Sequence, residues 1–194
     1  MILEFPNTPD KFRNFWETLA RLHANIQHNP ENKIDRFFEF FYLDFPYEDW
    51  DLKEFTDSTN ARIALNPSTY PEAQAMAIMT FEIDGSTANI ETVPVSLMFF
   101  KVPRSTNTKA DHNQAKRECF EKTMQTARSF KNLVRKYFKA NTEYGTLDYN
   151  SFRFAKTRMP DSTNAMYGMR LDFRYTINTA KCHHADEWLT DPLA

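Results

Sequence analysis

The sequence predicts an α+β domain, in which an antiparallel β-sheet carries two main α-helices packed on one face. Three observations support this prediction. Residues 111–139 follow a helical period without a break, residues 8–27 follow a second one, and residues 169–177 alternate between apolar and polar side chains. A chain of 194 residues, 41% of them hydrophobic, can bury one sizeable core, so we expect a single domain over residues 1–194. Residues 179–194 could form a flexible C-terminal tail.

The first predicted helix spans residues 8–27. Thr8 is a suitable N-cap, and Pro9 suits the first helical position because its missing N–H costs no hydrogen bond there. Apolar residues then recur at three- and four-residue steps until the chain reaches Pro30. His23 lies beside this apolar stripe, where we expect a packed or surface histidine rather than a ligand.

Residues 34–50 are rich in phenylalanine and fit a helical and an extended period equally well. We expect a helix at first and an extended chain near Pro46. The region around them, residues 31–57, holds nine acidic residues against three basic ones, a net charge of −6.

The middle of the chain predicts a β-hairpin, preceded by a weaker strand signal at residues 62–65. Residues 74–83 alternate, the Asp-Gly pair at 84–85 tolerates positive φ, and residues 93–99 form the returning strand. Pro94 has no N–H for a ladder, so that end of the strand should lie at an edge or a bulge. The opposite side of the strand is also apolar, which indicates burial on both faces or a partner surface. That second side consists of Met98, Phe100 and Val102.

After a polar loop, residues 111–139 form the long helix on which the sheet should pack. Asp111 can cap its first free N–H groups, and Gln114 follows three residues later, as in a capping box. Residues 113–139 also hold eight basic residues against two glutamates, a net charge of +6 in a chain whose net charge is −2. The apolar stripe of this helix consists of Cys119, Phe120, Met124, Ala127, Phe130, Val134 and Tyr137, widened by Leu133 and Phe138.

The chain closes with a second hairpin. Residues 141–150 read as a linker, Phe152 and Phe154 then alternate with polar neighbours, and residues 160–164 turn the chain. In the last strand, residues 169–177, one face should lie in the core and the other in water.

No pattern of residues indicates a catalytic centre or a cofactor site, and we expect a protein that is not an enzyme. Three glycines leave no room for a glycine-rich phosphate loop. Cys182, His183 and His184 could ligate a metal, but no second pair follows at zinc-finger spacing, so we expect none. A metal-dependent nuclease would need clustered carboxylates near a lysine, but such groups arise by chance in a chain with 26 acidic residues. The candidates are Asp44 and Asp51 with Lys53, or Glu82 with Asp84.

The opposite charges of residues 31–57 and 113–139 allow two interpretations. The charges could pair within one chain or be solvated, or unlike patches could meet between neighbouring copies in an oligomer. The basic helix could also bind nucleic acid, although its Tyr137 and Phe138 belong mostly to the core stripe. The candidate interface residues are Arg128, Lys131, Arg135 and Lys136 on the basic side, and Asp44, Glu48, Asp49 and Asp51 on the acidic side.

The N-terminus lacks the pattern of a secretory signal, and no stretch approaches the roughly 18 apolar residues of a membrane span. The two cysteines give no disulfide framework and fit a reducing compartment. We therefore expect neither classical secretion nor a membrane location.

The C-terminal sequence YGMRLDFRYTIN at 167–178, followed by ADEW at 185–188, resembles the ending of small structural proteins encoded by phages and prophages of Bacteroidetes. The order of the parts is similar too. It runs from DKFRNFWETLARLHANI at 10–26 through FFEFFYLDFPY at 37–47 to VSLMFFKV at 95–102, which precedes the long helix. This order is similar to that of tail completion or tail terminator proteins of crAss-like and related phages.

This resemblance implies a tail-terminator-like fold and a non-enzymatic virion protein that forms a ring at the head–tail junction, as a neck or connector protein, or in the tail. It implies copies of the chain itself as partners, in a six-fold or twelve-fold ring, together with other phage neck, portal or tail proteins. DNA could touch the ring lumen. The protein would be assembled in the host bacterial cytoplasm and reside in the virion. The alternatives are a metal-dependent nuclease and a nucleic-acid-binding accessory protein.

Overall fold

A computed structural model describes residues 3–26, 39–43, 53, 57, 74–80, 83–87, 89–103, 109–159 and 166–179 of the chain. The elements in chain order are α1 (Pro9–Leu22), β1 (Glu39–Leu43), β2 (Ala75–Thr80), β3 (Asp84–Thr87), β4 (Ile90–Lys101), α3 (Lys109–Ala140), β5 (Gly145–Leu147), β6 (Arg153–Arg158) and β7 (Tyr167–Asn178).

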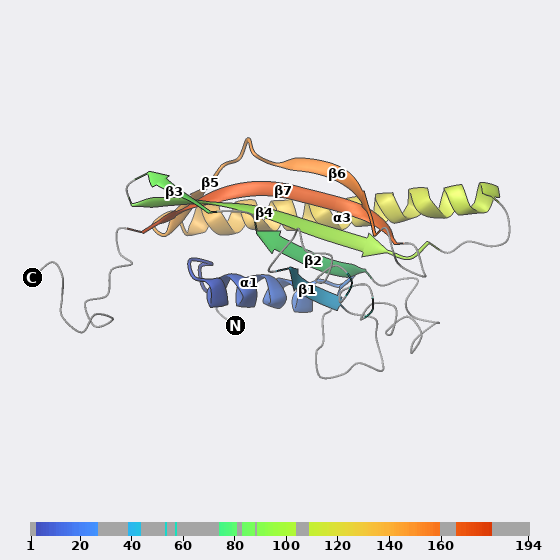
Figure 1. Cartoon of the computed structure of the whole chain (residues 1–194), viewed down its shortest axis with the longest axis horizontal. Helices are drawn as coiled ribbons and strands as arrows, with labels where there is room; N and C mark the ends of the chain where they lie inside the picture. Colours follow the sequence, from blue (N-terminus) through green and yellow to red (C-terminus); the bar gives the residue numbers. More distant parts are fainter. Residues whose placement is uncertain are drawn as a thin grey trace, which may run out of the picture.

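In the described part of the chain, seven strands form one sheet with the order β1-β2-β4-β7-β5, in which β3 pairs with β4 and β6 pairs with β7 (Figure 1). β1 runs parallel to β2, and the other pairings are antiparallel. The predicted α+β class with a mainly antiparallel sheet is therefore confirmed, and the parallel edge strand is an addition to it.

The main core lies between one face of the sheet and the two helices. Alternation along β7 points its odd-numbered side chains toward the helices, as the sequence predicted for residues 169–177. Both helices therefore cover the same face, because α1 and α3 contribute to one cluster with these side chains. The helix residues in this cluster include Phe12, Phe15, Trp16 and Leu19 of α1 and Ala127, Phe130, Val134 and Phe138 of α3.

The opposite face of the sheet has a second, smaller apolar cluster, so burial of β4 on both sides is confirmed. Met98, Phe100 and Val102 are buried there with Ala75 and Ala77 of β2. Two methionines at the β6–β7 turn, Met159 and Met166, complete the cluster.

Helix α1 begins as predicted but ends earlier. The Thr8 side chain accepts a hydrogen bond from the Lys11 N–H at 3.3 Å, and Pro9 is the first helical residue. The helix ends at Leu22 rather than at residue 27, because His23 has an extended backbone. The apolar pattern continues to Ile26, which is fully buried from a turn instead. Burial of Ile26 therefore satisfies the pattern without helical geometry.

Residues 39–43 form a strand where we expected a helix, and that prediction is wrong. Their backbone pairs with β2 in the register Glu39↔Ala75 to Leu43↔Met79. A run of aromatic residues fits either period, so the available partner edge on β2 decides the structure. The remainder of residues 34–50 and the strand signal at 62–65 lie outside the described residues.

The predicted turn at 84–85 is also wrong, because Asp84 and Gly85 belong to β3. Asn89, just before β4, has a φ of 61°. This is the left-handed conformation that asparagine tolerates better than most residues, and it turns the chain from β3 into β4.

Pro94 lies in the interior strand β4 rather than at a sheet edge, yet its missing N–H is accommodated. The Asn89 carbonyl accepts a hydrogen bond from the Thr179 N–H at 2.9 Å. Because hydrogen-bonded pairs alternate along an antiparallel ladder, the backbone groups of odd-numbered β4 residues bond to β7, and those of even-numbered residues point to the other side. On that other side the pairing with β2 ends at Val95 and the pairing with β3 begins at Thr92. Pro94 therefore occupies the gap between two partner strands.

Helix α3 begins at Lys109, so Asp111 lies inside the first turn and the capping box is wrong. The side-chain amide of Gln114 instead donates to Glu118 at 3.2 Å. Leu133 is 42% exposed and does not widen the apolar stripe. The linker at 141–150 contains the short strand β5, which pairs with β7.

We predict that Phe173→Ala lowers the free energy of unfolding by about 3–5 kcal/mol, because it leaves a cavity in the main core. Phe173 is 3% exposed, and its ring lies 5.3 Å from Phe152 and 5.9 Å from Trp16. Denaturant titration measures the loss. Leu22→Ala, at a site 65% exposed, serves as control and should change stability by less than about 1 kcal/mol. A similarly small loss for Phe173→Ala would show that the sheet orientation is wrong.

Candidate functional site

Helix α3 and strand β6 run antiparallel along one edge of the sheet and form a basic surface, here called the seam. Three contacts trace its course. Lys156 lies over the Phe120 ring at 4.9 Å, Lys131 over Phe154 at 5.5 Å, and the Arg135 guanidinium over Tyr149 at 5.5 Å. The basic residues of the seam are Lys116, Arg117, Arg128, Lys131 and Arg135 of α3 and Lys156 and Arg158 of β6.

Aromatic rings hold several of these cations in place. Lys131 also lies 5.1 Å from the Phe152 ring. The centre of the Tyr167 ring lies 5.2 Å from the Lys116 Nζ and 5.6 Å from the Arg158 Cζ. A cation over an aromatic face gains about 0.5–1 kcal/mol at an exposed site. The fold therefore orients five of the seven seam cations, namely Lys116, Lys131, Arg135, Lys156 and Arg158.

A groove of about 430 Å³ opens in the seam between α3, β6 and β7. Its apolar wall includes Phe120, Met124 and Met169, while Arg117 and Arg128 supply positive charge. The remaining lining residues are Glu121, Gln125 and Lys156.

The structure brings together three of the four predicted basic interface residues. Arg128 and Arg135 are exposed in the seam, and Lys131 is half-buried against its two rings. Lys136 lies about 80° further round the helix from Arg128, at 100° per residue, and faces away from β6. No carboxylate in the described ranges forms an ion pair with any of these four residues. The acidic residues Asp44, Glu48, Asp49 and Asp51 lie outside the described residues.

The outer side of β6 is a strand edge, open as far as the described strands are concerned. Met159 donates its N–H to the Met166 carbonyl at 3.1 Å, so Met159 and Met166 form a hydrogen-bonded pair of the ladder. Pairing alternates along an antiparallel ladder, so the N–H and C=O groups of Phe154, Lys156 and Arg158 point away from β7. No strand in the described part of the chain pairs with that side.

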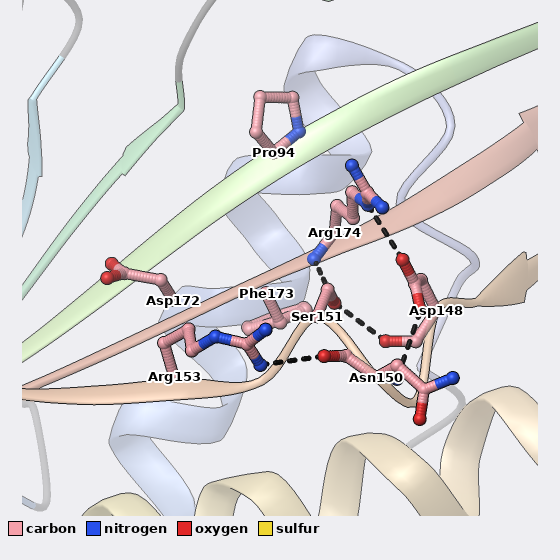
Figure 2. A pocket seen from close by; sticks show the side chains of 8 residues that line it. All are labelled: Pro94, Asp148, Asn150, Ser151, Arg153, Asp172, Phe173 and Arg174. Atoms are coloured by element: carbon pink, nitrogen blue, oxygen red, sulfur yellow. Dashed lines mark hydrogen bonds and ion pairs between the residues drawn. The ribbon is translucent and has the colours of Figure 1, made fainter.

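A second cavity, of about 440 Å³, lies on the face of the sheet opposite α1 and α3 (Figure 2). Arg174 Nε binds the Asp148 carboxylate at 2.7 Å, and the same carboxylate accepts the Asn150 N–H at 3.0 Å. The Ser151 hydroxyl donates to the Asp148 carbonyl at 2.6 Å and accepts the Arg174 N–H at 3.0 Å. The Arg153 guanidinium donates to the Asn150 carbonyl at 2.7 Å. These groups satisfy one another, so the cluster fastens the loop between β5 and β6 onto β7.

The sequence reading missed this cluster because it treated residues 141–150 as a linker. The local signal is Asp148 with Asn150 two residues later, a spacing typical of an Asx turn. The partner, Arg174, comes 26 residues after Asp148, and only the fold brings the two together.

The remaining candidates for chemistry are separated or packed. Lys53 pairs with Asp57 at 2.5 Å, Asp84 is exposed in β3, and the other proposed nuclease carboxylates lie outside the described residues. Burial raises the pKa of the Cys119 thiol to about 11, which keeps it protonated near neutral pH. His23 packs on the Phe130 ring at 5.2 Å, and burial lowers its pKa.

Tyr137 and Phe138 belong to the main core, as expected from the stripe. Cys182, His183 and His184 lie outside the described residues. Among the residues that the structure does describe, no three His, Cys, Asp or Glu side chains come close enough to hold a metal ion, and no helix is both long and apolar enough to cross a bilayer.

We predict that Arg174→Ala raises the pKa of Asp148. The hydrogen bond from Arg174 and that from the Asn150 N–H hold this pKa below its ordinary value. A lowered pKa in the folded state stabilises the fold above the ordinary value, and this contribution disappears as the pH falls through the folded-state pKa. The stability difference between the native protein and Arg174→Ala should therefore shrink in acid.

Carbon-13 NMR titration of the Asp148 carboxyl measures the shift directly. Arg153→Ala is the matched control, because Arg153 binds backbone carbonyls in the same cavity and not the Asp148 carboxylate. An unchanged midpoint in Arg174→Ala would contradict the assignment.

Comparison of the chain with models of protein families, with curated proteins and with solved structures gave no match. The resemblance to phage tail proteins therefore stays a prediction.

Proposed function

We propose that this chain is a non-enzymatic structural subunit of a phage particle, which assembles with copies of itself into a ring at the head–tail junction or in the tail. The order of parts that resembles tail completion and tail terminator proteins supports this proposal. The basic seam at one edge of the sheet also supports it, and this surface carries the argument.

The basic seam lies at one edge of the sheet, and an acidic run follows, in the sequence, the strand at the other edge. The seam lies at the β6 edge, and β1 lies at the other edge of the strand order (Figure 1). The acidic residues 44–51 follow β1 directly in the sequence. A head-to-tail contact needs two different, complementary surfaces on each subunit, and it closes into a ring when the rotation between subunits allows. Two such surfaces on one subunit would suit contact between copies.

A contact between two seams would place basic residues opposite one another, which disfavours a symmetric dimer through this surface. In the proposed ring, each seam meets the acidic residues 44–51 of the next copy. The resemblance suggests six or twelve copies, neck, portal or tail proteins as neighbours, assembly in the host bacterial cytoplasm and a final location in the virion.

Contact with DNA in the ring lumen is a second candidate role for the seam. From Lys116 to Arg135 the basic residues extend over about 28 Å of helix, at 1.5 Å per residue. A line of cations without described carboxylate partners suits the phosphate backbone. The seam rings lie beneath cations, so phosphate contact fits better than base stacking.

We predict that the double variant Arg128→Glu/Arg135→Glu keeps the fold but weakens assembly at least about tenfold, a change of roughly 1.4 kcal/mol per contact. Lys131 is left unchanged because it packs on two rings. Sedimentation velocity measures assembly, and circular dichroism checks the fold. The control is Arg13→Glu/Arg21→Glu, which reverses two exposed arginines on α1 and should assemble normally.

Mixing the seam variant with Asp49→Lys/Asp51→Lys should restore assembly. In an alternating ring, the two native surfaces meet at one contact and the two reversed surfaces, again of opposite charge, meet at the next. Normal assembly of the seam variant would contradict the proposed contact. Imaging of particles that places single copies without rotational symmetry would contradict the ring itself.

A further inference from the structure

We propose that the open edge of β6 is completed by β1 of a neighbouring copy, so that the sheet of one subunit continues into the sheet of the next. This inference rests on the proposed ring and names the backbone contact that would build it.

The first argument is the unmet hydrogen bonding of β6. The N–H and C=O groups of Phe154, Lys156 and Arg158 point outward, and no described strand meets them. Natural sheets cover or block such an edge, because an exposed row of donors and acceptors is a template for another strand. β6 is six residues long and contains no proline, so it is competent to pair along its whole length.

The second argument is that β1 and β6 lie at the same level of the sheet. Reading the register across the strands, Glu39 of β1 aligns through Ala75, Phe100 and Gly168 with Thr157 of β6. The other end of β1 aligns in the same way. There the register runs from Leu43 through Met79, Ser96 and Asp172 to Arg153. The five residues of β1 therefore match five of the six residues of β6 in both position and length.

Strand direction follows from the same topology. β1 and β7 run in one direction, and β4 and β6 in the other. A neighbour displaced in the plane of the sheet, without a shift along the strands, would place its β1 antiparallel to β6. Repetition of this contact is head-to-tail, as a ring requires.

Charge favours this pairing over pairing of like edges. In the unshifted register, β1 of the neighbour would bring one acidic residue, Glu39 opposite Thr157, and no basic residue to this edge. Two β6 strands would instead place three basic residues along each side of the contact, and like charges directly opposite one another are destabilising.

A β1 strand that pairs with β6 comes from a second copy. Within one chain, β2, β4 and β7 separate β1 from β6. Four strand spacings of about 4.8 Å place the two edges roughly 19 Å apart, so a chain cannot pair its own β1 with its own β6.

The test compares Lys156→Pro with Lys156→Ala. Both variants lose the lysine side chain over Phe120, but only proline removes the outward N–H. Lys156→Pro should retain the ladder with β7 and the circular dichroism of the fold, and its assembly should fall at least about tenfold below that of Lys156→Ala in sedimentation velocity. Ala155→Pro is a positional control, because the Ala155 N–H points toward β7 and its loss should destabilise the fold instead.

Amide hydrogen exchange of the unmodified protein provides a second measurement, which needs no variant to fold. The Lys156 amide should exchange slowly only in the assembled protein, whereas the Ala155 amide should be protected in both states. Equal assembly of Lys156→Pro and Lys156→Ala, or a Lys156 amide that exchanges equally fast in monomer and assembly, would overturn the inference and leave the ring in place. A native chain that stays monomeric up to its solubility limit would overturn the ring and the inference together.

Discussion

The pairing of β4 with β7 is the contact on which the rest of the structure depends. It joins twelve residue pairs, from Ile90↔Asn178 to Lys101↔Tyr167. This register turns the apolar sides of both strands toward the same face, where α1 and α3 bury them. The strands approach so closely at Gly168 that a Cβ there would overlap the Phe99 carbonyl. A glycine near the start of β7 is therefore a requirement of this pairing.

The same pairing determines which strands become edges. With β4 and β7 side by side, β2 and β1 can extend the sheet only beyond β4, and β5 and β6 only beyond β7. Helix α3 covers β7 and reaches the β6 side with the flank that carries Arg128 and Arg135. Exposed ion pairs contribute little one at a time. A surface with many oriented cations and a strand edge can combine charge with backbone hydrogen bonds, and this combination would give the proposed subunit contact its specificity.

Sequence reasoning succeeded where one period dominates and failed where the outcome depends on a distant partner. α3, β7 and the start of α1 were predictable, because long apolar patterns and the Thr8–Pro9 cap leave one interpretation. β1 was not predictable, because its aromatic residues fit both periods and it is the pairing with β2 that makes the segment a strand. The three residues of β5 are too few to show a pattern. The charge on α3 was visible, but its position beside β6 was not, since the strand that faces it is distant in the sequence.

The strands that pair with β4 and β7 change along a line across the sheet at Pro94. This change of partners explains why the proposed contact uses one half of the sheet. On β4, the partner changes from β2 to β3 at this level. On β7, at the paired residue Arg174, the partner changes from β6 to β5, and the polar cluster around Asp148 fills the interval (Figure 2). β1 and β6 therefore both lie on the same side of this line. Among the described strands, only β4 and β7 cross it, so a neighbour that extends one half of the sheet need not fit the other half.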